Sequence, residues 1–485
     1  MKNDNKADNS YGHVLKYTGI FGGVQVLNIL VGLVRTKAVA LLLGPAGMGL
    51  ASLFNTIVSF VSQATSFGIS FSAIRHISEI FDSGDERRIG EYVKTVRAWS
   101  LVAALLGVAV CVAAAPAIST YVFDGDAHTL EVMCLAPVVA LTAVTSGETA
   151  ILKGGRRLRE LAQSQVWMVF ATLAIAVPVY WKFRASGIIL VLLLAAVANA
   201  ALTLRYSYRF YPLRLGGAWG ALGAGTSMVR LGVAFILSGI FGSGAEMVVR
   251  SFLNATAGLD TVGLYNAGYM LTVTYAGMVF TAMETDYFPR LSAVNHDNAA
   301  VALVANRQIE VSLLILSPML TAMMLALPLL VPLLYSGKFV PVVGMAQAAV
   351  MSMYVRAVMI PVTYITLAKG HSRAYVVTEG VSAVGLVVAI MLCFSHWGLV
   401  GAGFAIVISN VLDLAIILVY AGIRYGYRPS RQVLACAAVH VPIGIVAYLA
   451  TCADSFMLRI GAGGVAVAAS LALSLRTLYN KRAKK

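Results

Sequence analysis

Four cationic side chains lie inside long apolar stretches of this chain, where charge is rare. They are Arg35, Lys37, Arg250 and Arg356. A charge near the centre of a bilayer costs roughly 2.5–3.5 kcal/mol on insertion scales, so such residues normally face protein or water. Arginine is also the side chain best shaped to bind phosphate. We therefore interpret all four as candidate cargo-binding residues of an anion-binding cavity inside the membrane.

Arg35 and Lys37 cannot both face one cavity from a regular helix. Two residues apart on an α-helix, they point about 200° away from each other. One would line the cavity while the other pairs or reaches toward the interface. Arg35 is favoured as the lining residue, because Arg250 occupies the matching place in the other half of the chain.

Two carboxylates inside apolar stretches are candidates for coupling to an ion, either a proton or Na⁺. Glu246 precedes Arg250 by four residues and so shares its helix face. Asp413 lies near the middle of a stretch at a depth similar to that of Arg356. A permanent salt bridge is the alternative interpretation of each pair.

A further group of charged residues lies toward the predicted inner ends of the stretches. Such residues are typical of interfaces and gates rather than of cargo binding, and the group comprises Glu148, Glu284, Asp286, Arg290 and Glu379.

The elements that carry these residues are predicted to be membrane helices. The chain is 59% hydrophobic and only 12% charged, and about 20 mostly apolar residues cross a bilayer. We predict an all-α integral membrane protein with about fourteen spans, at 17–43, 47–73, 98–118, 130–152, 163–182, 186–205, 230–256, 262–288, 310–335, 342–367, 375–395, 399–421, 433–452 and 458–475.

The basic charge predicts the orientation. With the N-terminus inside, 28 of the 36 Lys and Arg residues fall in inner segments, and only Lys182, Arg184, Lys338 and Arg459 fall outside. This asymmetry follows the positive-inside rule and places both termini in the cytoplasm. It explains the net charge of +15 without a nucleic-acid partner. The polar first sixteen residues and the long first apolar stretch indicate a retained span rather than a cleaved signal.

A repeat predicts two six-helix lobes. The pattern G-x-x-x-x-G-L occurs at Gly44–Leu50 and again at Gly258–Leu264, each time between two apolar stretches. We predict an N-terminal lobe at 1–204, a cytoplasmic linker at 205–229, a C-terminal lobe at 230–422 and an added helix pair at 423–485. An even number of spans per lobe predicts a parallel pseudo-repeat around a central cavity.

Several kinds of chemistry lack their usual residues. There is no G-x-x-x-x-G-K-[ST] loop for ATP, and the seven histidines show no metal-ligand spacing. Asp124-Gly125-Asp126 has the form of a sugar-nucleotide motif, but it falls in a short outer loop and is better interpreted as a turn. The five cysteines form no C-x-x-C pair. We expect neither an enzyme nor a resident cofactor or metal.

Two segments resemble bacterial polysaccharide-unit flippases, the O-antigen translocase family. They are Leu41–Glu79, with its G-P-x-G-x-G turn, and Val262–Ser292, which ends Y-F-P-R-L-S. The resemblance implies the fold of the multidrug/oligosaccharidyl-lipid/polysaccharide exporter superfamily, two lobes that alternate between inward and outward states. It also implies undecaprenyl-diphosphate-linked oligosaccharide as cargo, membrane lipid and polysaccharide-assembly proteins as partners, and the bacterial inner membrane as location.

Three alternatives stay open from the sequence. A drug/cation antiporter of the same superfamily would favour an acidic or aromatic pocket. A membrane enzyme that builds polysaccharide would need the catalytic loops that are missing. A non-transport component of a polysaccharide-assembly complex would have little use for charges inside the membrane.

Overall fold

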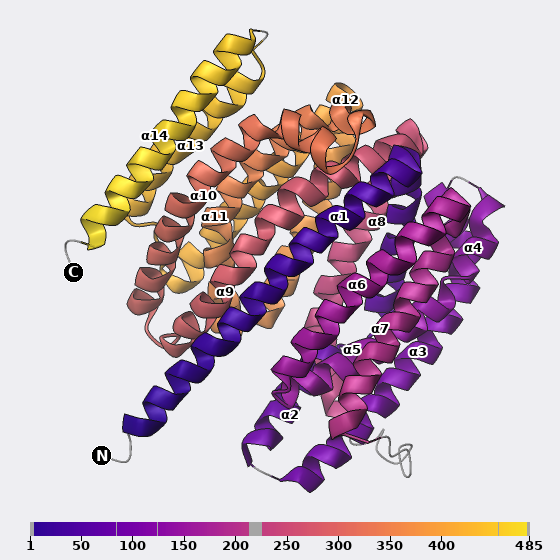
Figure 1. The fold of residues 1–485 in the computed structure, drawn as a ribbon. Coiled ribbons are helices and arrows are strands. Elements are labelled where there is room, and N and C mark those ends of the chain that lie inside the picture. Colours follow the sequence, from indigo (N-terminus) through magenta and orange to yellow (C-terminus); the bar gives the residue numbers. More distant parts are fainter. Residues whose placement is uncertain (1–3, 84, 124, 213–225, 454, 483–485) are drawn as a thin grey trace. The chain divides into compact units, whose positions relative to one another are not determined.

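All elements in the described part of the chain are helices (Figure 1). The computed structural model describes every residue except 1–3, 84, 124, 213–225, 454 and 483–485. The helices are α1 (Asp4–Thr65), α2 (Ile69–Ser83), α3 (Glu86–Phe123), η1 (Asp126–His128), α4 (Thr129–Met133), α5 (Ala136–Gly154), α6 (Leu158–Phe183), η2 (Arg184–Gly187), α7 (Ile188–Phe210), α8 (Thr226–Tyr269), η4 (Met270–Tyr275), α9 (Ala276–Ala293), α10 (Asn298–Leu334), η5 (Gly337–Val342), α11 (Val343–Ala368), α12 (Ser372–Tyr425), α13 (Arg431–Thr451) and α14 (Phe456–Arg482).

Ten helical segments in the described residues are long and apolar enough to cross a membrane. Four of them, Leu30–Thr65, Leu158–Phe210, Ile236–Phe280 and Ser372–Tyr425, each include parts of two predicted spans. The chain is therefore a multi-pass membrane protein, and the number fourteen stays a prediction.

The breaks inside these long segments occur where the sequence analysis separated the spans. Gly44, Gly258 and Gly398 adopt positive φ angles of 67°, 79° and 57°, with non-helical ψ angles. A positive φ favours glycine because a side chain would clash with the backbone. Each glycine lets the chain leave one helix and begin the next without a loop.

The second predicted span is too long by about two turns. Residues 47–73 were expected to form one helix, but α1 ends at Thr65 and α2 begins at Ile69. Phe67 and Gly68 have φ angles of 50° and 62°, which break the helix. The apolar face of α2 packs on α3 and α5 through buried Ile69, Ala73 and Ile77.

An internal repeat extends along most of the chain with one constant offset. Positive φ angles occur at positions 44 and 258, 156 and 370, and 184 and 398, each pair 214 residues apart. The start of α6 at Leu158 and of α12 at Ser372, and the ends of α5 at Gly154 and α11 at Ala368, share this offset. Helix α12 thus repeats α6 and α7, and α11 repeats α4 and α5. This supports the predicted duplication.

The same offset gives the register of the two arginines, which precede the first glycine of each motif by nine and eight residues. It aligns Arg250 with Thr36, whereas Arg35 aligns with Val249. The two arginines are thus one residue out of register, which is about 100° around a helix.

The chain forms two compact units, Met1–Gly258 and Leu259–Lys485, which we call unit 1 and unit 2. They divide at the Gly258 break, one helix later than the predicted linker at 205–229. The predicted lobe boundaries and the central cavity between lobes remain predictions.

The C-terminal pair α13 and α14 packs on α10 within unit 2 (Figure 1). Buried polar groups fix this contact. The Ser317 hydroxyl of α10 lies 2.8 Å from the Ser470 hydroxyl of α14 and 3.0 Å from Nδ1 of His440 in α13. Buried polar groups are stable only when hydrogen-bonded, so these pairs specify how the hairpin docks.

Candidate functional site

Arg250 and Glu246 form an ion pair on α8 in unit 1. Nη1 of Arg250 donates to Oε2 of Glu246 over 2.7 Å, as the four-residue spacing predicts. The Arg250 side chain is 8% exposed, whereas that of Glu246 is 43% exposed. The arginine is thus held inside the protein while its carboxylate partner remains accessible.

Arg35 and Lys37 are both half-buried in α1. Arg35 lies within electrostatic range of the buried Tyr180 of α6, which packs beside α1. The cargo-binding role of these two cations remains a prediction.

Unit 2 brings three predicted charged residues into one cluster. Arg356 of α11 lies within electrostatic range of Glu379 and of Asp413, and these two carboxylates also influence each other. Glu379 and Asp413 come from the two halves of α12, before and after the Gly398 break. The Ser382 hydroxyl donates to Oδ1 of Asp413 over 2.7 Å.

The cluster joins residues to which the sequence analysis gave different roles. Asp413 was predicted beside Arg356, and the structure places it there, whereas Glu379 was predicted as a separate gate residue. Two half-buried carboxylates and one arginine leave the cluster with a formal charge of −1. Such a group can take up a proton or a small cation at low cost, because binding removes repulsion between the carboxylates.

The repeat gives unit 1 a neutral version of this cluster. At the 214-residue offset, Glu379 aligns with Gln165, Asp413 with Asn199 and Arg356 with Thr142. Thr142 and Asn199 line a common groove of about 250 Å³. Each carboxylate of the unit 2 cluster thus aligns with the amide of matching side-chain shape in unit 1. The charges of this cluster therefore occur in only one half of the repeat.

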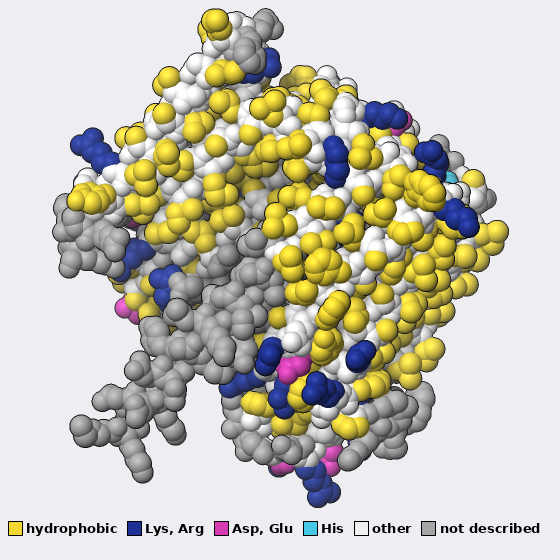
Figure 2. Space-filling model, in the orientation of Figure 1, with side chains coloured by type: hydrophobic (Ala, Val, Ile, Leu, Met, Phe, Trp, Pro, Cys, Tyr) yellow, Lys and Arg dark blue, Asp and Glu magenta, His cyan; other side chains and the backbone are white. Residues whose placement is uncertain are grey.

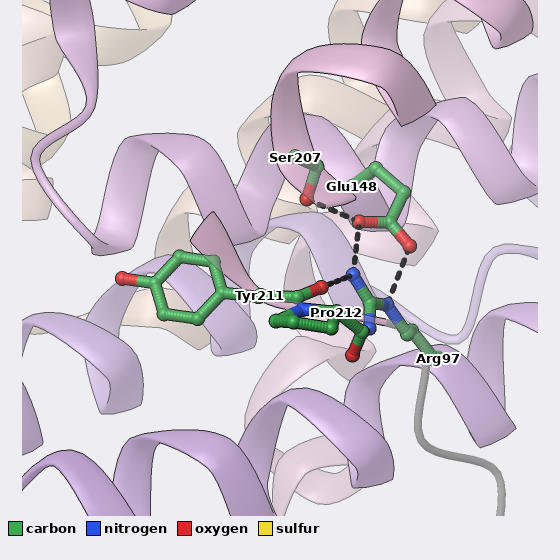
Figure 3. Close-up of polar contacts among 5 residues, drawn as sticks. All are labelled: Arg97, Glu148, Ser207, Tyr211 and Pro212. Carbon is green, nitrogen blue, oxygen red and sulfur yellow. Dashed lines mark hydrogen bonds and ion pairs between the residues drawn. The ribbon is translucent and has the colours of Figure 1, made fainter. Parts of the chain in front are cut away.

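A buried clamp centred on Arg97 lies among α3, α5 and α7 of unit 1 (Figure 3). Nε and Nη2 of Arg97 donate to the two carboxylate oxygens of Glu148 over 2.7 and 3.2 Å. The Ser207 hydroxyl donates to Oε2 of Glu148 over 2.5 Å. Arg97 also donates to the carbonyl oxygens of Tyr211 and Pro212, over 2.8 and 3.0 Å.

The clamp joins three helices at the place where the chain leaves α7. Arg97 belongs to α3, Glu148 to α5 and Ser207 to α7. Both members of the ion pair are buried, and bidentate geometry with further hydrogen bonds offsets the cost of removing them from water. Glu148 was predicted as a gate residue, and that role remains a prediction.

Sequence reasoning missed Arg97, because its partner lies 51 residues away and no local spacing connects them. A basic pocket of about 690 Å³ adjoins the clamp, and it is lined in part by Lys94, Arg97, Arg157 and Tyr211. The guanidinium of Arg157 lies 4.1 Å from the centre of the Phe210 ring, at a distance typical of a cation–π contact.

The remaining predicted gate residues lie in α9. Arg290 is exposed, with Nη2 at 3.5 Å from Oε1 of Gln308 in α10. Glu284 and Asp286 are on the same helix, but their side chains lie outside what the structure describes. A search of the described residues found no group of three His, Cys, Asp or Glu side chains that could hold a metal ion.

Comparison with solved structures shows the fold. The chain is similar to the lipid II flippase MurJ in an inward closed conformation, with a TM-score of 0.67, 13% identity, and coverage of 95% of this chain and 99% of that one. It is also similar to an inward-facing multidrug resistance MATE family transporter of the MOP superfamily, with a TM-score of 0.64, 14% identity, and coverage of 86% and 96%.

Comparison with characterised sequences shows the family. The chain is 23% identical over 378 residues to the lipid III flippases of Escherichia coli K12 and of Shigella flexneri, covering 76% of this chain and 86% of each relative. Residues 38–344 match the family described as polysaccharide biosynthesis protein. The chain belongs to this polysaccharide biosynthesis protein family and has the fold of the MOP superfamily.

Proposed function

We propose that the protein flips undecaprenyl-diphosphate-linked oligosaccharide units from the inner to the outer leaflet of a bacterial inner membrane. The observation that carries this proposal is the family match over residues 38–344. Two similar proteins are named as flippases, one of lipid III and one of lipid II. No covalent chemistry is involved, because the cargo crosses intact.

The intramembrane cations fit an anionic head group. Arg35, Lys37 and Arg250 lie in unit 1 and Arg356 in unit 2, all buried or half-buried. A diphosphate group offers the paired oxygens that guanidinium groups bind best. The lipid tails stay in the bilayer while the sugar unit crosses through a polar cavity that opens to each side in turn.

We further propose that a proton or Na⁺ drives the alternation by competition for the arginines. Glu246 holds Arg250, and Asp413 lies beside Arg356. An ion that binds either carboxylate weakens its hold on the arginine, which is then free to bind diphosphate. The partial exposure of Glu246 supports this order of events, since the ion can reach it.

The internal repeat suggests substitutions that test whether unit 2 couples flipping to an ion gradient. The double variant Glu379→Gln, Asp413→Asn gives unit 2 the amides that unit 1 already carries at those positions and leaves Arg356 in place. We expect flipping in liposomes to lose its response to imposed proton or sodium gradients. The control variant Gln165→Glu changes the matching position of unit 1 and should respond as wild type does. Unchanged gradient dependence in the double variant would exclude coupling through these carboxylates.

A drug antiporter is the second candidate, favoured by the similarity to MATE transporter structures. Depletion of the protein from its own cells separates the candidates. A flippase predicts that complete lipid-linked units accumulate on the inner leaflet while drug susceptibility stays unchanged. An antiporter predicts increased drug susceptibility with normal surface polymer, and a biosynthetic enzyme predicts incomplete sugar units. Normal surface polymer without accumulation would refute the proposed function.

A further inference from the structure

A second basic site lies on α6 and α7 of unit 1, on the side of α7 opposite Ser207 of the clamp. It is a groove of about 500 Å³ between α6 and α7, which we call the α6–α7 groove. Its lining residues are Gln163 and Trp167 of α6 with Leu202, Arg205, Tyr206 and Arg209 of α7. None of these described lining residues is acidic.

The spacing of the lining residues follows from the two helices. Helices α6 and α7 are antiparallel neighbours joined by the short η2 turn, so the start of α6 and the end of α7 lie together. Gln163 and Trp167 are one turn apart, as are Arg205 and Arg209, so each pair shares a helix face. The four side chains therefore surround one opening.

The two arginines have no anionic partner among the residues that the structure describes. Arg205 and Arg209 are exposed, and neither makes an ion pair or hydrogen bond with a described residue. Arg205 ends a predicted span and Arg209 lies one turn beyond it, at the depth where lipid head groups begin. Guanidinium groups at that depth bind phosphate well, because water competes less than in bulk solution.

Farther along α6 and α7, away from the arginines, the same helix faces carry exposed apolar side chains. Leu190, Leu194 and Val197 continue the arginine face along α7, and Phe170 continues the Trp167 face along α6. Figure 2 shows hydrophobic side chains over this flank, with Lys and Arg side chains at the end that carries α2. The surface thus offers a phosphate site above two strips that fit acyl chains, and Trp167 and Tyr206 are of the types enriched at membrane interfaces.

The repeat shows that this groove is not a consequence of the fold. At the 214-residue offset, Arg205 and Arg209 align with Val419 and Ile423, and Trp167 with Val381. These residues of unit 2 are exposed and apolar, Ile423 by 84%. The same helix positions therefore accept purely apolar residues, so the cationic and aromatic set in unit 1 has a separate cause.

We propose that the α6–α7 groove binds the phosphate head group of an anionic phospholipid, a diacyl lipid such as phosphatidylglycerol. The inference concerns a bound membrane lipid and not the flipped cargo. Basic pockets between membrane helices on the cytoplasmic side bind such head groups, and the positive-inside count predicts that this end is cytoplasmic. The lipid would fix α6 against α7 next to the clamp.

The test counts bound lipid on the purified full chain by native mass spectrometry. Phosphatidylglycerol and phosphatidylcholine with identical acyl chains are titrated separately, and inorganic phosphate forms a third series. We expect phosphatidylglycerol to bind more tightly than phosphatidylcholine, and phosphate alone to bind too weakly to compete. Each arginine near an anionic surface contributes about 1 kcal/mol, so Arg205→Val with Arg209→Ile should weaken phosphatidylglycerol binding roughly thirtyfold.

The variant carries the residues that unit 2 has at the matching positions, so we expect it to fold. Thermal unfolding of the variant without lipid checks its stability. The control Arg373→Gln with Arg431→Gln removes two exposed positive charges of unit 2, outside the groove, and should bind as wild type does. Quenching by brominated phosphatidylglycerol should also fall when Trp167 is replaced by Phe. Equal binding of both lipids by wild type, or an equal loss in the control, would overturn the proposal, as would full competition by phosphate.

Discussion

At the scale of single residues, the Arg97–Glu148 clamp is the most completely bonded charge pair described in unit 1. Each of the three guanidinium nitrogens of Arg97 donates a hydrogen bond. Of the four bonds, two go to the Glu148 carboxylate and two to backbone carbonyl oxygens. The ring of Tyr208 lies 4.5 Å from the guanidinium carbon. These bonds hold α3, α5 and α7 in one arrangement, because loss of either charged partner would leave the other charge buried and unpaired.

The clamp predicts a strong dependence of stability on pairing. Glu148→Ala should lower the free energy of unfolding by about 3–5 kcal/mol, since Arg97 would remain buried and uncompensated. The double variant Arg97→Leu, Glu148→Leu should recover most of that loss, because neither charge remains. Thermal unfolding in detergent measures both. A double variant no more stable than Glu148→Ala would show that the pair does not act as a unit.

The intramembrane arginines give a second prediction at this scale. Arg35→Ala, Arg250→Ala and Arg356→Ala should each reduce surface-polymer export about tenfold or more while the protein stays inserted, since each removes a charged hydrogen-bond donor to the cargo. Lysine at the same position should retain little activity if paired phosphate contacts matter. Export should be measured beside the amount of protein in the membrane. Full export by all three alanine variants would remove the proposed role.

How far sequence predicts these residues depends on sequence distance. The pair Glu246–Arg250 follows from the helix period alone. The contact of Arg97 with Glu148 depends on how α3, α5 and α7 pack, which no local pattern encodes. The association of Glu379 with Asp413 was also missed, although the amides Gln165 and Asn199 at one constant offset would have connected them.

At the scale of elements, the breaks between helices matter more than the helices themselves. Gly44, Gly258 and Gly398 mark breaks that the apolar pattern located within a few residues. The break at Phe67 and Gly68 falls inside the predicted span 47–73, because apolar residues continue through it. The sequence therefore locates a break where the apolar stretches separate and misplaces the end of a helix where they continue.

Arg184 and Gly398 occupy matching positions of the repeat, and their backbone angles lead to a prediction about stability. Both have positive φ, 49° and 57°, with ψ angles of −132° and −140°, a region where a side chain is strained by about 1–3 kcal/mol. Arg184→Gly should thus keep or raise the unfolding temperature, whereas Gly398→Ala should lower it. No atom lies within 4 Å of a Cβ placed on Gly398, so the loss would come from the backbone alone. Opposite shifts in thermal unfolding would contradict the shared conformation.

At the scale of the whole molecule, composition and apolar pattern predicted the fold class, and the family match and fold similarity confirm it. The strong hydrophobic signal of membrane helices explains this success. The C-terminal pair was predicted as an addition, and buried Ser317, His440 and Ser470 explain its docking within unit 2. Its partner helix could not be predicted, because the contacts join residues more than 100 positions apart.

The charge distribution predicts the orientation of the molecule. Single cysteines at positions 126 and 338 should react with an impermeant thiol reagent from outside the cell, and cysteines at 86 and 214 should react only after the membrane is opened. The reason is that 28 of 36 basic residues then lie inside. A cysteine-free parent is the control for background labelling. The reverse pattern of labelling would invert the proposed direction of transport.

Flipping by the purified protein tests the central claim most directly. Proteoliposomes carry a fluorescent undecaprenyl-diphosphate-linked oligosaccharide in both leaflets, and a membrane-impermeant quencher reports how fast protected cargo reaches the outer leaflet. We predict rapid exchange with wild-type protein and slow exchange with the Arg35→Ala, Arg250→Ala and Arg356→Ala variants. Wild-type protein that moves the cargo no faster than protein-free liposomes, under every imposed ion gradient, would contradict the account.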